Sequence, residues 1–144
     1  MKPRGLILFI DDEIHEHHLL NSALRHLGYD NKTVSFYNGL DALEFIKTTS
    51  ENIFLILSDL NMPKMNGLEL KRIIDMTPEL RLKAIPFIFH SSSGNPVEIK
   101  EAYTLNIQGY FEKHLSIEDT IKDLGIIMNF WSCCIHPRDL PFED

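Results

Sequence analysis

The sequence is poor in cysteine, in positive charge and in long apolar runs, and each shortage excludes a class of protein. Only two of its 144 residues are cysteines. Cys133 and Cys134 are neighbours in the chain, so that a bridge between them would strain the backbone. A disulfide scaffold is therefore excluded, and a reducing, cytoplasmic setting is expected.

The shortage of positive charge bears on nucleic acids. Lysine and arginine together number 14 against 21 aspartates and glutamates, which leaves a net charge of -7. Binding to a phosphate backbone needs clustered basic residues, whereas the basic residues here are scattered. We therefore expect no nucleic-acid partner.

The apolar runs are too short for a membrane span. The N-terminal run Leu6–Ile10 meets Asp11 and Asp12 too early for a signal peptide or a transmembrane segment. No membrane partner is expected from this pattern.

What the sequence does have is enough apolar residues, 44%, for the core of one ordinary domain. Runs of strand length recur at Leu6–Ile10, Thr33–Phe36, Ile53–Leu57, Pro86–Phe89 and Gln108–Phe111. Most are apolar throughout rather than alternating, which is typical of parallel strands covered on both faces.

Segments with helical spacing lie between the runs, in Leu20–Leu27, Ala42–Ile46, Leu70–Ile74 and Ile99–Tyr103. Local signals agree. Gly28 closes the first helix, Asn95 and Pro96 begin the fourth, and Ser116 with Asp119 approximates a capping box for the last. Five repeats of strand and helix predict an α/β fold, a doubly wound parallel sheet with helices on both faces and ligands at the carboxyl ends of its strands.

Polar side chains stand where these strands end. Asp11 and Asp12 follow the first strand, Asp59 the third, Ser91 the fourth and Lys113 the fifth. Carboxylates that converge at one edge repel each other, so they either hold protons or share a cation. A hard divalent ion such as Mg²⁺ suits oxygen ligands of this kind.

With a cation present, a carboxylate can act as a nucleophile towards a phosphoryl group, since the ion, a lysine and a hydroxyl stabilise charge on the transferred oxygens. Asp59 is the best candidate for this nucleophile, because it ends what would be the central strand.

Several motifs make a family resemblance specific: the Asp11-Asp12 pair, the pattern D-x-x-M-P-x-x-x-G, the Ser91 hydroxyl and the Tyr110 and Lys113 of the fifth strand. The D-x-x-M-P-x-x-x-G pattern is complete as Asp59, Met62, Pro63 and Gly67. The chain resembles a response-regulator receiver domain, the phosphoacceptor module of two-component signalling, over roughly residues 5–132.

The resemblance implies a flavodoxin-like (βα)5 fold, with five strands in the order 2-1-3-4-5. We expect a stand-alone receiver domain over residues 1–132 and a proline-containing tail over 133–144. The partner expected is a histidine kinase or a phosphotransfer protein.

The resemblance also implies residue roles. Mg²⁺ (or Mn²⁺) would be bound directly by Asp12, Asp59 and the backbone carbonyl of Asn61, and by Asp11 through water. Asp59 would accept the phosphoryl group, whose oxygens Ser91 and Lys113 would bind. Tyr110 would be the switch aromatic that turns inward when Ser91 moves. Met62, Pro63 and Gly67 would shape the loop, and Ser93 with Asn61 would flank the attacking water, so that hydrolysis is not unusually slow.

One departure concerns the residue after Lys113, where the family usually has a proline that commonly follows a cis bond. Here it is His114. A cis bond before a residue other than proline costs about 2.5–4 kcal/mol. We predict a trans bond, a reshaped loop and a Lys113 amine that still reaches the pocket.

The last helix is richer in apolar residues than one buried face needs. Ile117, Ile121, Leu124, Met128 and Trp131 form one stripe, and Ile126, Ile127 and Phe130 extend it round the side. The surplus favours a symmetric homodimer built on the fourth helix, the fifth strand and the last helix. Alternatively, the tail from Ile135 to Phe142 folds back over it.

Other histidines have plainer interpretations. His15, His17 and His18 open an amphipathic helix without further ligands at metal spacing, which favours a solvated helix face. His90 is interpreted as filler near the site, with acid-base work a minor alternative.

Two rival functions remain open. A haloacid-dehalogenase-like phosphohydrolase also uses an aspartate nucleophile with Mg²⁺, but its second acid is Asn61 here. A pseudo-receiver would keep the fold for protein binding alone, against which the intact Asp12, Asp59, Ser91 and Lys113 speak.

Overall fold

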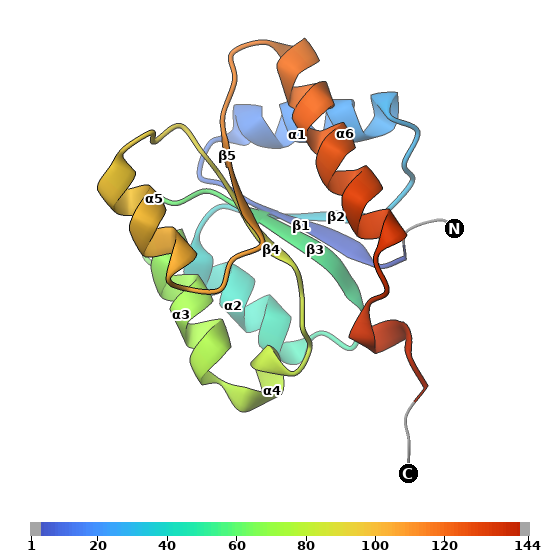
Figure 1. Ribbon diagram of the computed structural model, residues 1–144, viewed down its shortest axis with the longest axis vertical. Helices are drawn as coiled ribbons and strands as arrows, with labels where there is room; N and C mark the ends of the chain where they lie inside the picture. Colours follow the sequence, from blue (N-terminus) through green and yellow to red (C-terminus); the bar gives the residue numbers. More distant parts are fainter. Residues whose placement is uncertain (1–3, 142–144) are drawn as a thin grey trace.

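The structure is a computed structural model that describes residues 4–141. Five parallel strands form one sheet in the order β2-β1-β3-β4-β5, which confirms the expected flavodoxin-like topology (Figure 1). The strands are β1 (Leu6–Ile10), β2 (Thr33–Phe36), β3 (Ile53–Ser58), β4 (Phe87–Ser91) and β5 (Gly109–Glu112). The last two begin one residue later than predicted, because their pairing with the neighbouring strands starts at Phe87 and Gly109.

Within the described residues, one helix appears that the sequence pattern did not predict. The helices are α1 (Ile14–His26), α2 (Gly39–Thr48), α3 (Gly67–Met76), α4 (Pro78–Arg81), α5 (Pro96–Tyr103) and α6 (Ile117–Cys133), followed by a 3₁₀ turn η1 (Pro137–Asp139). The unexpected helix is α4, whose four residues are too few to show a helical hydrophobic period. The helix expected as the fourth is therefore α5, and the last is α6.

Apolar side chains fill both faces of the sheet. Figure 1 shows α2, α3 and α5 on one side, where they cover residues such as Leu8, Ile56 and Phe89. On the other side, α1 and α6 cover residues such as Phe9 and Leu57. β1 and β3 are buried along their whole length, whereas the edge strand β2 is half-buried. The central strands thus form a rigid base for the residues at their carboxyl ends.

The predicted helix caps are confirmed. The side chain of Asn95 accepts a hydrogen bond from the backbone N–H of Val97 (2.9 Å), and that of Ser116 accepts one from Asp119 (3.2 Å). Gly28 follows α1 with a φ of 84°, a conformation that favours glycine. No described helix has the length and the apolar character needed to cross a membrane.

The apolar surface of α6 is smaller than predicted. Leu124 and Met128 are buried as expected, but Ile127 is also only 4% exposed, so its assignment to the surplus was wrong. It lies three residues after Leu124, on the same helix face. Ile126 and Phe130 remain exposed, at 52% and 58%.

The tail covers neither of these exposed residues. The ring of His136 is buried and lies 5.9 Å from Trp131 and 5.0 Å from Phe54, at the end of α6. The alternative in which the tail covers the exposed part of α6 is therefore not supported by the described part of the tail. Its Phe142 lies outside the described residues.

Candidate functional site

Three carboxylates converge at the edge where the parallel strands end. Oxygens of Asp11, Asp12 and Asp59 all lie within 4.8 Å of one another. The pairing of Ile10 with Ser58 sets β1 beside β3, so that the residues following them are adjacent. Asp11 and Asp59 are buried, at 2% and 7% exposed, while Asp12 is open to solvent. The arrangement is a partly buried acidic pocket.

Lys113, directly after β5, reaches into this pocket. Its ammonium nitrogen lies 2.8 Å from Oδ2 of Asp11 and 3.1 Å from Oδ2 of Asp59. The backbone N–H of Lys113 donates to the carbonyl of Ser91 (2.9 Å), which ties the end of β5 to that of β4. The pocket thus contains one ammonium group among three carboxylates.

This imbalance perturbs the ionisation of the pocket. Burial is the main cause that raises the pKa of Asp11 to about 6, and the charge of Asp59 adds to it, although hydrogen bonds from Lys113 and Glu13 act in the opposite direction. Burial opposes the charge of Lys113, but its hydrogen bond to Asp11 and the charges of Asp59 and Asp11 outweigh it, so the pKa of the amine is raised. A further positive charge would relieve the remaining repulsion.

The backbone after β3 holds Asp59 in place. Oδ1 of Asp59 accepts a hydrogen bond from the N–H of Leu60 (2.7 Å), while the Asp59 carbonyl accepts one from the Ser58 hydroxyl (2.8 Å). Oδ2 remains for Lys113. Each oxygen of the carboxylate therefore has a defined donor, and the side chain is oriented before any ligand binds.

The loop from β3 to α3 depends on a glycine. A Cβ atom on Gly67 would collide with the carbonyl of Asp59 and the ring of Phe89. The N–H of Gly67 donates to the carbonyl of Leu60 (2.8 Å), and Asn66 caps α3 by accepting from Glu69 (2.9 Å). In this loop Asn61 and Pro63 are exposed and Met62 is half-buried. The tight approach explains why glycine stands at position 67.

The end of β4 is connected to β5 through the following loop. The hydroxyl of Ser91, 1% exposed, accepts a hydrogen bond from the N–H of Ser93 (3.2 Å). The phenol of half-buried Tyr110 donates to the carbonyl of Ser93 (2.8 Å). The Ser93 hydroxyl donates to Glu98 of α5. Ser91 and Tyr110 are therefore linked through one residue.

The interpretation of the α1 histidines as a solvated face was wrong for His17. Its ring is 3% exposed and Nε2 lies 2.7 Å from the backbone carbonyl of Asp11, whereas His15 and His18 are exposed. His17 stands three and seven residues before Leu20 and Leu24, which share its buried face. That spacing is the signal that could have identified it. Sequence reasoning also missed Glu16, which is buried and whose pKa is raised mainly by burial.

His90 lies near the end of β4, next to Ser91. It is 5% exposed, and burial is the main cause that lowers its pKa to about 4, followed by the charge of Lys113. A neutral buried ring agrees with its interpretation as filler.

His114, which stands where the family usually has a proline, follows a trans peptide bond and contacts α6. The described residues contain no cis peptide bond, so the Lys113–His114 bond is trans as predicted. The ring of His114 turns to α6, where Nε2 lies 2.8 Å from Oδ2 of Asp123.

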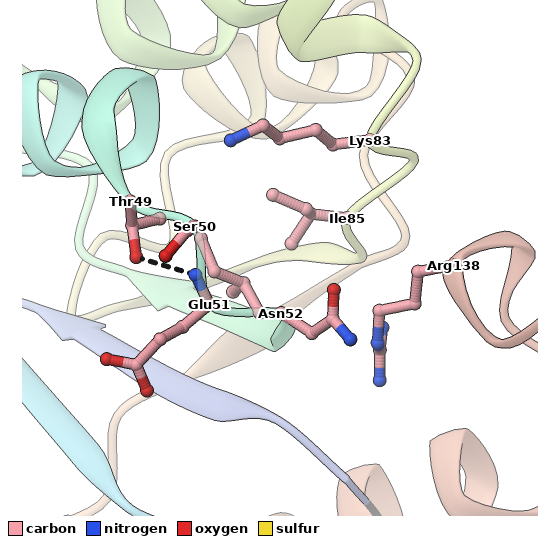
Figure 2. Close-up of a pocket in the computed structure, with 8 residues that line it drawn as sticks. Thr49, Ser50, Glu51, Asn52, Lys83, Ile85 and Arg138 are labelled. Carbon is pink, nitrogen blue, oxygen red and sulfur yellow. Dashed lines mark hydrogen bonds between the residues drawn. The ribbon is translucent and has the colours of Figure 1, made fainter.

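A separate pocket lies at the other end of the strands, by the residues that precede β3 (Figure 2). Its lining includes Asn52, Lys83 and Arg138. The ammonium of Lys83 is already bound to the carbonyl of Ile46 (2.7 Å), and Thr49 accepts from the N–H of Glu51 (3.1 Å). The described residues thus bring reactive groups together at the carboxyl edge and not here.

Known proteins share these features. Residues 7–124 match the response regulator receiver domain family. The chain is 29% identical over 134 residues to the response regulator Rcp1 of Synechocystis sp., with 90% of each chain covered. It is 26% identical to the chemotaxis protein CheY1 of Helicobacter pylori, covering 85% of this chain and 95% of the relative.

Solved structures agree. The Mn²⁺-bound form of response regulator Rcp1 superposes with a TM-score of 0.82 at 27% identity, covering 93% of this chain and 99% of the other. The phosphorylated cyanobacterial phytochrome response regulator RcpA does so with a TM-score of 0.82 at 25% identity and the same coverage. Since the family match extends from β1 into α6 and includes all the residues of the acidic edge, the chain belongs to the response regulator receiver domain family, whose members are signalling domains.

Proposed function

We propose that this protein accepts a phosphoryl group on Asp59 from a histidine kinase or a phosphotransfer protein. The observation that carries the proposal is the contact of the Asp59 carboxylate with Lys113 inside a pocket that also holds Asp11 and Asp12. Neither the phosphohydrolase nor the pseudo-receiver gains support from the relatives, which are response regulators.

The pocket suits Mg²⁺ or Mn²⁺. Three carboxylates converge there, and the single ammonium group of Lys113 pairs with two of them, Asp11 and Asp59. All the possible ligand atoms are oxygens, which hard divalent cations prefer. Asp12, Asp59 and the carbonyl of Asn61 would hold the ion directly, with Asp11 acting through water. The relative Rcp1 has been solved with Mn²⁺ bound, which supports this assignment. When bound, the ion would neutralise negative charge on the transferred phosphoryl oxygens.

The transfer step uses groups already in place. A carboxylate oxygen of Asp59 attacks the phosphorus of the donor's phosphohistidine and forms an O–P bond. The P–N bond breaks, its electron pair stays on the imidazole nitrogen, and that nitrogen takes up a proton. Lys113 and the Ser91 hydroxyl then donate to the phosphoryl oxygens. Self-dephosphorylation follows when water attacks the same phosphorus. Asn61 and Ser93, which would flank this water, are both small and polar, so hydrolysis is not unusually slow.

Switching would begin at Ser91. Because its hydroxyl holds the N–H of Ser93, and Ser93 holds the phenol of Tyr110, drawing Ser91 towards a phosphoryl group disturbs both bonds. Tyr110 then turns inward. The phosphoryl group favours this state only through the contacts that it gains there.

The output surface proposed is the face of α5, β5 and α6. It exposes Tyr103, Ile126 and Phe130, which suit a homodimer. We assign residues 1–132 to the receiver domain and 133–144 to a tail. A cytoplasmic location fits the free thiols of Cys133 and Cys134.

The test is phosphorylation by a small donor. Wild-type protein incubated with Mg²⁺ and acetyl phosphate or phosphoramidate should gain the mass of one phosphoryl group, and Asp59→Asn should not. Asp30→Asn, which changes an exposed aspartate near β2, is the matched control and should still gain it. Chelation of the metal should suppress the reaction. Steady turnover of a chromogenic phosphate ester that Asp59→Asn abolishes would instead favour a phosphohydrolase.

A further inference from the structure

The connection from β5 to α6 is short and is attached at three points. It comprises residues 113–116. The N–H of Lys113 is bound to the Ser91 carbonyl (2.9 Å), the ring of His114 to Asp123 (2.8 Å), and the side chain of Ser116 to the N–H of Asp119 (3.2 Å). Between the last two, Leu115 is fully exposed. The side chains of His114 and Ser116 therefore anchor the connection to α6.

The side chains of the adjacent residues Lys113 and His114 extend to different parts of the molecule. The Lys113 side chain, 8% exposed, enters the acidic pocket, while the His114 side chain, 38% exposed, turns away to Asp123. The Asp123 side chain is 20% exposed, so the contact is partly shielded from water.

The neighbouring His90 does not compete with His114 for the Asp123 carboxylate. Buried His90 is influenced by the charges of Lys113, Asp123 and His114, so the four groups lie near one another. Since the pKa of His90 is lowered to about 4 by burial first and Lys113 second, its ring is neutral near pH 7 and carries no charge that competes for the carboxylate.

We propose that the His114–Asp123 pair positions Lys113 for phosphoryl transfer, in place of a proline ring that would constrain the backbone after the lysine. This inference rests on the proposed function. Lys113 is the residue that contacts the transferred group, and His114 and Asp123 are positioning residues that act through it.

The expected consequence is specific to the rate. A misplacement of about 1 Å can cost on the order of 100-fold in rate, because reacting groups must be aligned. Neither His114 nor Asp123 contacts a carboxylate of the pocket among the described interactions, so loss of the pair should not weaken Mg²⁺ binding. Any effect of losing the pair on Mg²⁺ binding should be a gain in affinity, because Lys113 competes with the ion for Asp11 and Asp59.

The experiment measures the phosphorylation rate with phosphoramidate at saturating Mg²⁺, and the Mg²⁺ affinity by calorimetry, in the full chain. The variants are His114→Ala, Asp123→Ala and the double alanine variant. His114→Gln, whose amide N–H has a reach similar to Nε2 of histidine, is the rescue variant. Glu118→Ala removes an exposed acid from the same helix and is the matched control.

Each single alanine variant should slow phosphorylation about tenfold, and the double variant should be no slower than either, because the two residues act as one unit. His114→Gln should recover most of the rate, and Mg²⁺ affinity should be unchanged or higher. Wild-type rates in the single variants, additive losses in the double variant, or a joint loss of Mg²⁺ affinity and rate without rescue by glutamine would each overturn the inference. A wild-type protein that gains no phosphoryl group at Asp59 would overturn the proposed function as well.

Discussion

The ammonium nitrogen of Lys113 lies 3.1 Å from Oδ2 of Asp59, although 54 positions separate the two residues in the chain. They follow β5 and β3, which are not neighbours, since β4 lies between them. The long lysine side chain must therefore pass the end of β4 to reach the carboxylate. The charge of Asp59, the proposed phosphoacceptor, thus interacts directly with a residue that follows the outermost strand, β5.

Removal of the Lys113 charge should show how much this interaction contributes to stability. Lys113→Met keeps the apolar stem but leaves Asp11 and Asp59 without a counter-charge. We expect the free energy of unfolding in chelator to fall by about 3 kcal/mol. Mg²⁺ should restore part of it, because the ion replaces the lost charge, while phosphorylation stays slow.

Urea unfolding with and without Mg²⁺ measures this effect. Lys122→Met, which replaces an exposed lysine of α6, is the control and should change little. Equal stability of Lys113→Met and wild type in chelator would show that the ion pair does not offset the burial of the acids.

Gly67→Ala should destabilise the protein by about 1–3 kcal/mol, since the added methyl group meets the Asp59 carbonyl and the Phe89 ring. Gly125→Ala is the control, because its Cβ would meet only the flexible end of Leu27 and alanine favours a helix. Thermal unfolding of both variants checks the prediction. Similar melting temperatures for the two would contradict the tight approach at Gly67.

His90 should make the protein less stable in acid. The folded pKa of about 4 lies below the ordinary value of 6.5, so the unfolded chain binds the proton first. Stability is therefore complete above pH 6.5 and falls as the pH drops towards 4, by on the order of 3 kcal/mol. His90→Leu should remove this part of the pH dependence.

Chemical unfolding of wild type and His90→Leu at several pH values between 7 and 4 tests the sign. The difference in unfolding free energy should shift in favour of the leucine variant as the pH falls. A difference that is constant across this range would mean that the buried ring takes up its proton as readily as in the unfolded chain.

Ile126→Glu should prevent the proposed homodimer while leaving phosphorylation of Asp59 intact, because Ile126 is 52% exposed on α6 and lies outside the acidic pocket. Equilibrium sedimentation with and without a phosphate mimic measures the association state. Lys122→Gln serves as a polar control on the same helix. A wild-type protein that stays monomeric at high micromolar concentration in both conditions would refute the dimer.

The elements that apolar runs define could be predicted from the sequence, and with them the positions of the strand-end groups. Asp11, Asp59 and Lys113 came together because parallel strands bring their carboxyl ends to one edge. The helix α4 escaped prediction because a single turn has no period.

Features that depend on one side chain's direction were harder to predict. His17 was assigned to a solvated face because no further ligand follows at metal spacing, although its spacing matched the buried face of α1. The hydrogen bond of Ser93 to Glu98 and the pair of His114 with Asp123 depend on how two loops turn in space. Hydrophobic periodicity carries no information about those turns.

The central claim is that Asp59, and no other acid of the pocket, carries the phosphoryl group. After incubation with Mg²⁺ and phosphoramidate, reduction with borohydride converts a phosphorylated aspartate to homoserine, and sequencing of the peptides by mass spectrometry locates it. We predict homoserine at position 59 alone. Homoserine at position 11 or 12, or a phosphoryl group that remains on a histidine, would contradict the account.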